Sequence, residues 1–310
     1  SISIILIILY CFEQFKKCFM KSIKVTVFGW DGFTCQIPRI KEAMLDLGHN
    51  LSEDSPELIY CNDPIDFQKA IDLKKKHPKA FLILNILDIP WHFPNINKLI
   101  EAWKTLLLKA DAVTTISEKV KNDLSKFLDK KIYVIYNPVK DVFYDEKIQK
   151  NNMFLYVGRA NDPIKRINLV HESLTKIKDG LKSIKICGSE NPGFGNYLGV
   201  VSDVILNELY NSSKYVYLPS KAEGIGLTMI EAMICGTIPI MCSDNLTAKE
   251  FAPNDFICDP SPQSLVEKIS ELNKDYKNKR NLALEYGKKY KIQFSKKKIA
   301  ENIINIFDSR

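Results

Sequence analysis

The chain is poor in the residues that build metal centres and disulfide frameworks. It has four histidines and eight cysteines among 310 residues, and no two cysteines have the C-x-x-C spacing. No histidine stands near a cysteine at the spacing of metal ligands, and no Asp-x-Asp pair follows an apolar strand-like run. We therefore expect no metal site and no cofactor. Several cysteines lie within apolar runs such as IKICGS, which is typical of buried free thiols in a reducing, cytoplasmic compartment.

Dense clusters of lysine and arginine with interleaved aromatic residues are also missing, although the net charge is +7. The sequence therefore does not favour nucleic acid as a partner. A mildly basic chain suits an anionic ligand or an acidic membrane surface, so we leave open an association with the inner face of a membrane.

The N-terminal run SISIILIILYCF is apolar but shorter than the roughly 20 residues that a membrane-spanning helix needs. Met20 then opens MKSIKVTVFGW, which has the pattern of a first strand. We interpret residues 1–19 as an apolar extension. It is either an over-extended reading frame, the end of a truncated segment, or a membrane anchor.

Apolar β-branched runs alternate with amphipathic segments along the rest of the chain. The predicted strands are residues 23–30, 56–61, 80–87, 112–117, 131–139, 153–160, 181–189, 215–220 and 238–243. The predicted helices are residues 37–47, 63–78, 95–110, 118–128, 167–177, 203–213, 227–236 and 296–307. This alternation predicts parallel sheets with helices on both faces.

The rhythm of strand and helix restarts after residue 150, which predicts two domains. We expect an α/β protein with two doubly wound, Rossmann-like sheets facing each other across a cleft. The expected domains are residues 20–140 and 141–295, followed by a C-terminal helix at 296–310.

The segment KAEGIGLTMIEAM, residues 221–233, carries the clearest chemical signal. The strand YVYLPS ends before AEGIG, and a helix should begin close to Gly226 or Leu227. Glycines let the backbone approach a ligand, and the N–H groups of Gly226, Leu227 and Thr228 would form an anion site at the helix start. Glu231, about one turn further, would repel an anion but could accept hydrogen bonds from ribose hydroxyls. Glu223 would face another part of the same ligand. The alternative is that both acidic residues are here only because negative side chains are favoured near the start of a helix.

Two positive side chains follow the strand FLYVGR. Arg159 should emerge at the carboxyl end of this strand, where open α/β sheets bind ligands. A guanidinium can bind phosphate oxygens in a bidentate way, and Lys165 adds a second positive charge. A surface salt bridge is the alternative for Arg159. The nearby GFG in ENPGFGNYLG lacks the spacing of a dinucleotide-binding loop, which argues against a dehydrogenase.

The segment EGIGLTMIE resembles the E-x7-E motif of retaining GT-B glycosyltransferases, specifically glycosyltransferase family 4. The surrounding block from VSDVILNELY to IPIMCSDN, the segment VGRANDPIKR and the final FSKKKIAENIINIF also resemble that family. The similarity covers most of residues 153–307 and is weaker over residues 22–140. It implies the GT-B fold and transfer of a sugar from a nucleotide-diphosphate sugar, with retention of anomeric configuration and without a metal.

The resemblance implies roles for the residues of the second domain. Glu223 would lie by the sugar, Glu231 would hold the ribose, and Arg159 and Lys165 would bind the diphosphate. The remaining donor-binding candidates are Gly224, Gly226, Leu227, Thr228, Gly188 and Ser189 and, in the first domain, Gly29 and Gly32.

The first domain should hold the acceptor, which the resemblance implies is a glycan, a lipid-linked sugar or another hydroxyl compound. Relatives often carry a His-Asp pair after the buried third strand, whereas this chain has Leu87-Asp88. Asp88 is therefore the catalytic candidate here, with His92 and Asp31 as acceptor-side candidates. The alternatives are a GT-B-like protein that binds nucleotide or glycan without turnover, and a peripheral protein that binds anionic lipid.

Overall fold

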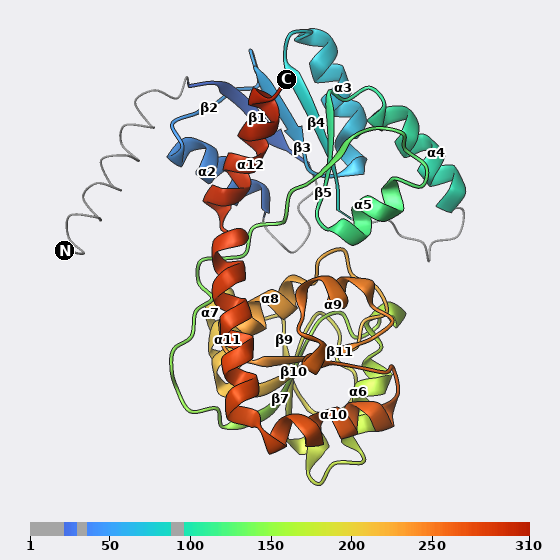
Figure 1. Ribbon diagram of the computed structural model, residues 1–310, viewed down its shortest axis with the longest axis vertical. Coiled ribbons are helices and arrows are strands. Elements are labelled where there is room, and N and C mark those ends of the chain that lie inside the picture. Colours follow the sequence, from blue (N-terminus) through green and yellow to red (C-terminus); the bar gives the residue numbers. More distant parts are fainter. Residues whose placement is uncertain (1–21, 30–35, 88–95) are drawn as a thin grey trace, which may run out of the picture. The chain divides into compact units, whose positions relative to one another are not determined.

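The computed structural model of the protein describes residues 22–29, 36–87 and 96–310 (Figure 1). The chain forms two compact units. Unit 1 runs to Ile116 and also contains Val120–Pro138 and Lys296–Arg310, whereas unit 2 contains Val139–Ser295 and Ser117–Lys119. Each unit has its own parallel sheet, so the alternating pattern of the sequence is realised twice.

Unit 1 contains a six-stranded parallel sheet in the order β2-β1-β3-β4-β5-β6. Its strands are β1 Lys24–Phe28, β2 Asn50–Leu51, β3 Leu58–Cys61, β4 Phe81–Ile86, β5 Ala112–Thr115 and β6 Ile132–Val134. Its helices are α2 Gln36–Asp46, α3 Phe67–Lys76, α4 Ile96–Leu107, α5 Glu118–Leu124 and α12 Lys296–Asp308. One apolar cluster joins α2 and α12 to the sheet, and a second joins α3, α4 and α5 to it. The sheet is therefore covered on both faces, as near-continuous apolar strands require.

The C-terminal helix α12 packs on α2 within unit 1 (Figure 1). Lys296 Nζ lies 2.6 Å from Glu42 Oε1 at the start of the contact, and Ile299, Ile303 and Phe307 bury its apolar face. The last helix thus belongs to the core of unit 1.

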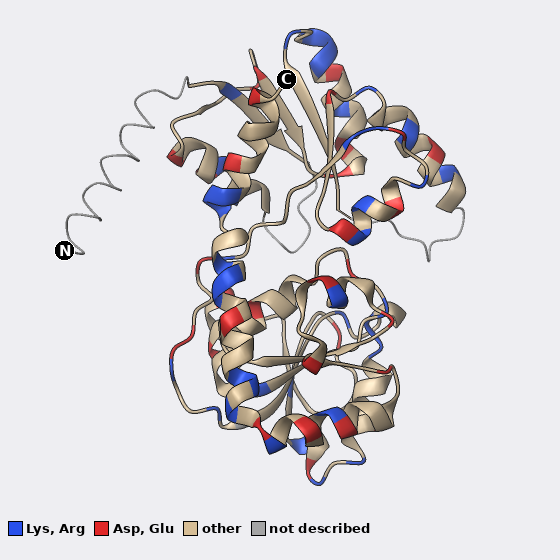
Figure 2. Cartoon of the chain, in the orientation of Figure 1, with Lys and Arg blue, Asp and Glu red and all other residues tan. Residues whose placement is uncertain are grey.

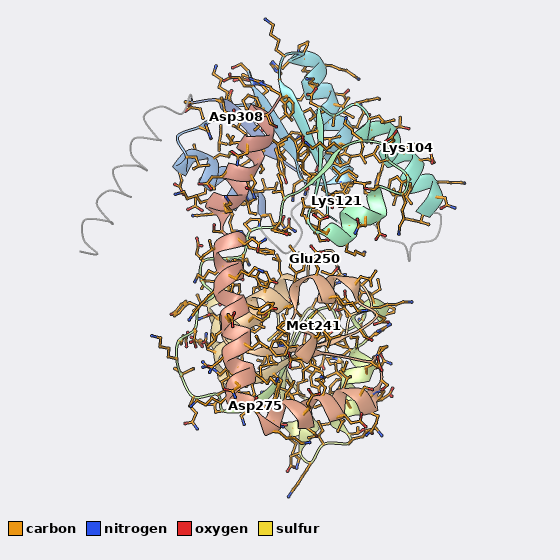
Figure 3. The ribbon with its side chains drawn as sticks, viewed as in Figure 1. Lys104, Lys121, Met241, Glu250, Asp275 and Asp308 are labelled. Carbon is orange, nitrogen blue, oxygen red and sulfur yellow. The ribbon has the colours of Figure 1, made fainter. Side chains whose placement is uncertain are left out.

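Unit 2 contains a second six-stranded parallel sheet in the order β12-β11-β10-β7-β8-β9. Its strands are β7 Asn152–Val157, β8 Ile184–Cys187, β9 Asn196–Gly199, β10 Ser213–Leu218, β11 Ile238–Cys242 and β12 Ile257–Cys258. Its helices are α6 Ile167–Leu174, α7 Asp203–Ser212, α8 Leu227–Ile234, α9 Leu246–Phe251, α10 Pro262–Lys274 and α11 Tyr276–Gln293. Figure 3 labels Met241, which is buried on β11 in this sheet.

The two sheets confirm the predicted fold class. The helices α9, α10 and α11 and the short strands β2, β9 and β12 were not predicted. The apolar face of α11 is narrow, because only Ala283, Gly287 and Tyr290 are buried along its length. At Gly287 a Cβ atom would lie 2.3 Å from the carbonyl oxygen of Met233, so glycine allows α11 to approach the end of α8.

Among the residues that the structure describes, no helix is long and apolar enough to cross a membrane. Basic and acidic side chains are interspersed along the helices of both units (Figure 2). The thiols of Cys61, Cys187, Cys235 and Cys242 are free and buried, as the apolar sequence context predicts.

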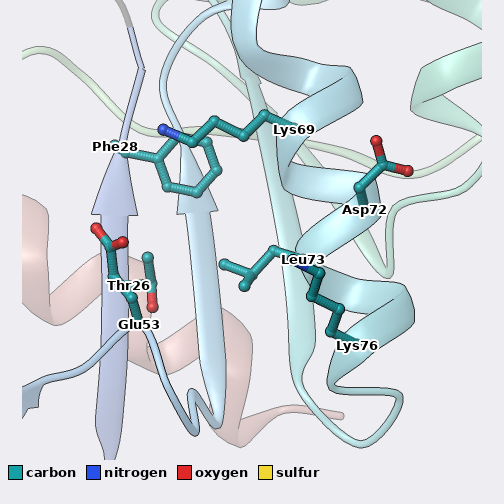
Figure 4. A pocket seen from close by; sticks show the side chains of 7 residues that line it. All are labelled: Thr26, Phe28, Glu53, Lys69, Asp72, Leu73 and Lys76. Atoms are coloured by element: carbon teal, nitrogen blue, oxygen red, sulfur yellow. The ribbon is translucent and has the colours of Figure 1, made fainter.

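A pocket in unit 1 lies between β1 and α3, beside the helix-free connection from β2 to β3 (Figure 4). Thr26, Phe28 and Leu73 line it together with charged side chains, and Lys69 Nζ lies 5.0 Å from the centre of the Phe28 ring. Of the predicted donor- and acceptor-side residues, those that the structure describes do not line this pocket.

Candidate functional site

The turn after β7 presents the two predicted cations. Asp162 accepts a hydrogen bond from the backbone N–H of Ile164 at 3.0 Å, and Pro163 opens a short 3-10 helix that ends at Lys165. Arg159 Nη2 donates to Asp162 Oδ2 at 2.6 Å. Burial alone would raise the pKa of the Asp162 carboxyl, but the Ile164 N–H and the Arg159 guanidinium lower it below its usual value. Arg159 thus has the salt bridge that the alternative interpretation predicted, although its side chain remains 53% exposed.

The turn after β10 leads into α8. Gly226 precedes the helix with a φ of 72°, a left-handed conformation that favours glycine, and α8 begins at Leu227 as predicted. The backbone N–H of Lys221 donates to the carbonyl oxygen of Ile164 at 2.8 Å, so this turn is fixed to the turn after β7. Thr247 donates its hydroxyl to the carbonyl oxygen of Glu223 at 2.5 Å.

Lys165 and Glu223 form an ion pair where these two turns meet. Lys165 Nζ lies 2.5 Å from Glu223 Oε1, and the two side chains are 23% and 20% exposed. The sequence predicted that these residues contact different parts of one ligand, and the structure brings them together, 58 residues apart in the chain. Each of the two charges is the ionic partner of the other at this partly buried place.

Glu231 lies one turn into α8 and is supported by α7. The hydroxyl of Tyr210 donates to Glu231 Oε2 at 3.2 Å and also forms a hydrogen bond with the side chain of Thr228. Burial, followed by the charge of Glu231, raises the pKa of Tyr210 well above its ordinary value, so the phenol stays neutral and can donate. The orientation of Glu231 is therefore fixed by a buried neighbour.

Lys150 joins the C-terminal ends of the same two helices. Its ammonium group donates to the carbonyl oxygens of Tyr210, Asn211 and Cys235 and to the hydroxyl of Thr237, at 3.0–3.2 Å. Burial, followed by the positive charge of Arg280, lowers the pKa of Lys150 to about 7. The C-terminal end of α7, which carries Tyr210, is thereby held against the C-terminal end of α8.

Gly188 follows β8, at a place where the neighbouring backbone leaves no room for a side chain. Its N–H donates to the carbonyl oxygen of Gly199 at 3.0 Å, and its own carbonyl oxygen accepts from the Tyr197 hydroxyl at 3.0 Å. A Cβ atom at Gly188 would lie 2.0 Å from the carbonyl oxygen of Gly158, which is the residue before Arg159. Any side chain here would displace the turn that carries the two cations.

Gly188→Ala is expected to destabilise the protein by about 3 kcal/mol, at the upper end of the usual cost of overpacking. Gly193→Ala in the same loop is the matched control, because no atom lies within 4 Å of its Cβ position and only the φ of 80° opposes it. Chemical unfolding of both variants checks this. Equal loss of stability in the two would show that contact with Gly158 is unimportant.

One feature of the site had no signal in the sequence. Arg166, next to Lys165, has a φ of 50° and donates to Asp244 through both Nη atoms, at 2.9 and 2.5 Å. This ion pair holds an arginine in a conformation that usually favours glycine. It fixes the backbone just after Lys165.

Several predicted residues stand apart from this group. Asp31, Gly32, Asp88 and His92 lie outside the described residues, so their roles stay predictions. Gly29 belongs to unit 1, where its φ of 128° and a Cβ position 2.9 Å from the N atom of Asn62 explain the glycine without a ligand. Ser189 is exposed after Gly188, and Gly224 is half-buried in the turn before α8. Within residues 22–29, 36–87 and 96–310, no group of three histidine, cysteine, aspartate or glutamate side chains is arranged to hold a metal ion.

Residues 195–290 match the sequence model of the family described as glycosyl transferases group 1. The chain is 30% identical over 182 residues to an O-antigen chain mannosyltransferase of Salmonella typhimurium, covering 52% of this chain and 51% of that protein. It is also 30% identical over 224 residues to N,N'-diacetylbacillosaminyl-diphospho-undecaprenol alpha-1,3-N-acetylgalactosaminyltransferase of Campylobacter jejuni, covering 67% of this chain and 57% of that protein. The chain thus spans only about half the length of these curated relatives.

Among solved structures, the Anabaena protein HepE in complex with UDP and glucose superposes with a TM-score of 0.74 at 14% identity, covering 93% of this chain and all of that one. Similarity at this level of identity establishes the fold. The protein therefore has the GT-B fold, and its residues 195–290 carry the sequence pattern of glycosyl transferases group 1.

Proposed function

We propose that the protein is a glycosyltransferase that moves a sugar from a nucleotide-diphosphate sugar to a hydroxyl group of a glycan or a lipid-linked acceptor. We further propose that it belongs to glycosyltransferase family 4, retains the anomeric configuration and needs neither a metal nor a cofactor. The observation that carries the proposal is the meeting of Lys165 with Glu223 at the turn that leads into α8.

The chemical demand of this reaction matches the charges of the site. Breaking the glycosidic bond places negative charge on the departing diphosphate and positive character on the sugar ring. Lys165, Arg159 and the N-terminus of α8 offset the negative charge on the diphosphate. Glu223 faces the positive character on the sugar ring. Because two cations and a helix dipole are available, the proposed mechanism uses no divalent ion.

Retention of configuration is proposed to occur on one face of the sugar, with the departing phosphate helping to deprotonate the acceptor. A double displacement would need two carboxyl groups about 5 Å apart on one sugar ring. Here Glu223 is held by Lys165, while Glu231 is held by Tyr210 from α7. We assign the two glutamates to the sugar and to the ribose, respectively.

A panel of UDP-, GDP- and ADP-sugars tests this function with the full chain. One nucleotide sugar, at about 100 times its dissociation constant, should stabilise the protein by about 2.7 kcal/mol, and nucleotide should be released when an acceptor is added. Chelation of metals should leave the rate unchanged. Binding without release of nucleotide or transfer of sugar would instead support a non-catalytic GT-B-like binding protein.

Glu231→Ala is expected to weaken binding of the nucleoside diphosphate by about 10–100-fold, because a hydrogen bond to a charged group is lost. The matched control is Glu208→Ala on α7, since that carboxylate is exposed on the helix that carries Tyr210. Calorimetric titration checks both variants. Unchanged affinity in Glu231→Ala would contradict the assignment of Glu231 to the ribose.

The acceptor side of the proposal draws on one of the relatives. The Campylobacter jejuni relative is named for an acceptor linked to diphospho-undecaprenol. We propose a lipid-linked acceptor for this chain too, with Asp88 as a catalytic residue, Asp31 and His92 on the acceptor side, and peripheral association with an anionic membrane. Gly29 and Gly32 are proposed to face the donor phosphates, and Gly188 and Ser189 the nucleoside base.

A further inference from the structure

Lys150 is a buried lysine that is surrounded by neutral oxygens. Only 8% of the residue is exposed, and within the described part of the chain its amino group donates to three backbone carbonyl groups and to the Thr237 hydroxyl. Lysine is rarely buried, because removing its amino group from water is costly. A lysine at this place therefore calls for a reason.

The three carbonyl groups lie at the ends of two helices. Tyr210 and Asn211 belong to the last turn of α7, and Cys235 directly follows α8. The last carbonyl groups of a helix lack the intrahelical partner that the others have. A single side chain from the segment before β7 thus supplies hydrogen bonds to the ends of both helices.

Two chains of hydrogen bonds run from Lys150 to Glu231. In the first, the Tyr210 carbonyl oxygen accepts from Lys150 at 3.0 Å, and the Tyr210 hydroxyl donates to Glu231 Oε2 at 3.2 Å. In the second, the Cys235 carbonyl oxygen accepts from Lys150 at 3.2 Å, and the Cys235 backbone N–H donates to the Glu231 carbonyl oxygen at 3.2 Å. The first chain contacts the carboxylate of Glu231 and the second contacts its backbone.

We propose that Lys150 is a positioning residue for binding of the donor nucleotide. By fixing Tyr210 and Cys235, it holds the Glu231 carboxylate in the orientation that binds the ribose. The ligand of Glu231 rests on the proposed function, whereas the link from Lys150 to Glu231 rests on the contacts alone. Because the ribose takes no part in the chemical step, Lys150 should affect binding and not the rate of that step.

Lys150→Met tests the proposal, because methionine keeps an apolar stem in this space and removes the amino group. The probe is the nucleoside diphosphate that the native protein binds best among UDP, GDP and ADP. Its affinity should fall about tenfold in calorimetric titration, at the lower end of the range expected for Glu231→Ala, since the carboxylate is misplaced but present. Unchanged affinity in a folded Lys150→Met protein would overturn the proposal.

A double-mutant cycle shows whether this loss passes through Glu231. In the Glu231→Ala background, Lys150→Met should change the affinity by less than about twofold, because the carboxylate that it orients is gone. The matched control is Lys140→Met, which removes a lysine that pairs with Asp203 at 2.6 Å, at the opposite end of α7. It should keep native affinity. A tenfold loss in both backgrounds, or an equal loss in Lys140→Met, would overturn the proposal.

Thr237→Val is a milder variant that decides the question even where Lys150→Met does not fold. Valine keeps the shape of threonine and removes the hydroxyl that accepts from Lys150 at 3.0 Å and donates to the Tyr210 carbonyl oxygen. Affinity should fall about threefold in the native background and stay unchanged in the Glu231→Ala background. An equal fall in both backgrounds, or none in either, would overturn the proposal.

Turnover gives a readout that a general loss of stability would not imitate. With the nucleotide sugar that the native protein uses, Lys150→Met should raise the donor KM about tenfold and change kcat by less than about twofold. A lower kcat with unchanged KM would overturn the role in binding.

A cycle on thermal stability needs no ligand and separates this proposal from the proposed function. Tyr210→Phe removes the hydroxyl that donates to Glu231, so Tm should fall by about 2–4 °C in the native background. The fall should be less than half as large in the Lys150→Met background, where the hydroxyl is no longer aligned. An equal fall in both would overturn the positioning role. A native protein that binds no nucleotide would contradict the proposed function, and this cycle would still decide the link from Lys150 to Glu231.

Discussion

Lys165→Met is expected to lower kcat by about 10²–10³-fold, the usual cost of removing one preorganised group that stabilises developing charge. Methionine keeps the apolar stem of the side chain and removes the ammonium group that lies 2.5 Å from Glu223 Oε1. In the proposed reaction this ammonium offsets the negative charge that accumulates on the diphosphate. Initial rates of nucleotide release, measured at saturating donor and acceptor, check the prediction.

The control for this variant is Lys221→Met, which removes an exposed positive charge from the neighbouring turn. It should change kcat by less than about twofold, because exposed charges are screened by solvent and salt. If both variants lost activity equally, the loss would come from net charge. If Lys165→Met kept native activity, Lys165 would not act on the leaving group.

Glu223→Gln should lower kcat by about 10²-fold, since the carboxylate that faces the developing positive charge on the sugar becomes neutral. The same change should leave the affinity for the nucleoside diphosphate unchanged or make it tighter. Glu223 and the phosphate compete for Lys165, and the amide of glutamine holds an ammonium group less strongly than a carboxylate does.

Replacement of Glu223 should therefore lower kcat without weakening nucleotide binding. Replacement of Glu231, by contrast, should weaken nucleotide binding. Steady-state rates and calorimetric titrations on the same preparations measure both quantities. A Glu223→Gln protein that binds the nucleoside diphosphate much more weakly would contradict the assignment of Glu223 to the sugar side of the ligand.

The sequence predicted most of the fold because its strands are long apolar runs. FLILNI and SKYVYL are buried along nearly their whole length, and such runs are typical of parallel strands covered on both faces. The short strands β2, β9 and β12 give almost no periodic signal over two to four residues. β9, Asn196–Gly199, lies within the glycine-containing segment ENPGFGNYLG and is too short to show an alternating pattern.

The local geometry of the site was also accessible from the sequence. Gly226 as the residue before α8 and Arg159 after the end of β7 follow from turn chemistry and strand alternation. The ion pair between Lys165 and Glu223 could not be predicted from the sequence. It depends on how two turns that are distant in the sequence are joined by the backbone hydrogen bond from Lys221 to Ile164.

Features that violate a local preference were invisible to pattern analysis. The left-handed conformation of Arg166 is stabilised by Asp244, 78 residues away. Such departures from local preference are most common near functional sites. Here Arg166 directly follows Lys165.

A crystal structure of the protein with the nucleotide sugar that it binds tests the central claim most directly. We predict phosphate oxygens within about 3 Å of Lys165 Nζ, close to Arg159 and the N-terminus of α8, with Glu223 released from Lys165. Diphosphate bound away from Arg159 and Lys165, with the Lys165–Glu223 ion pair intact, would contradict the account.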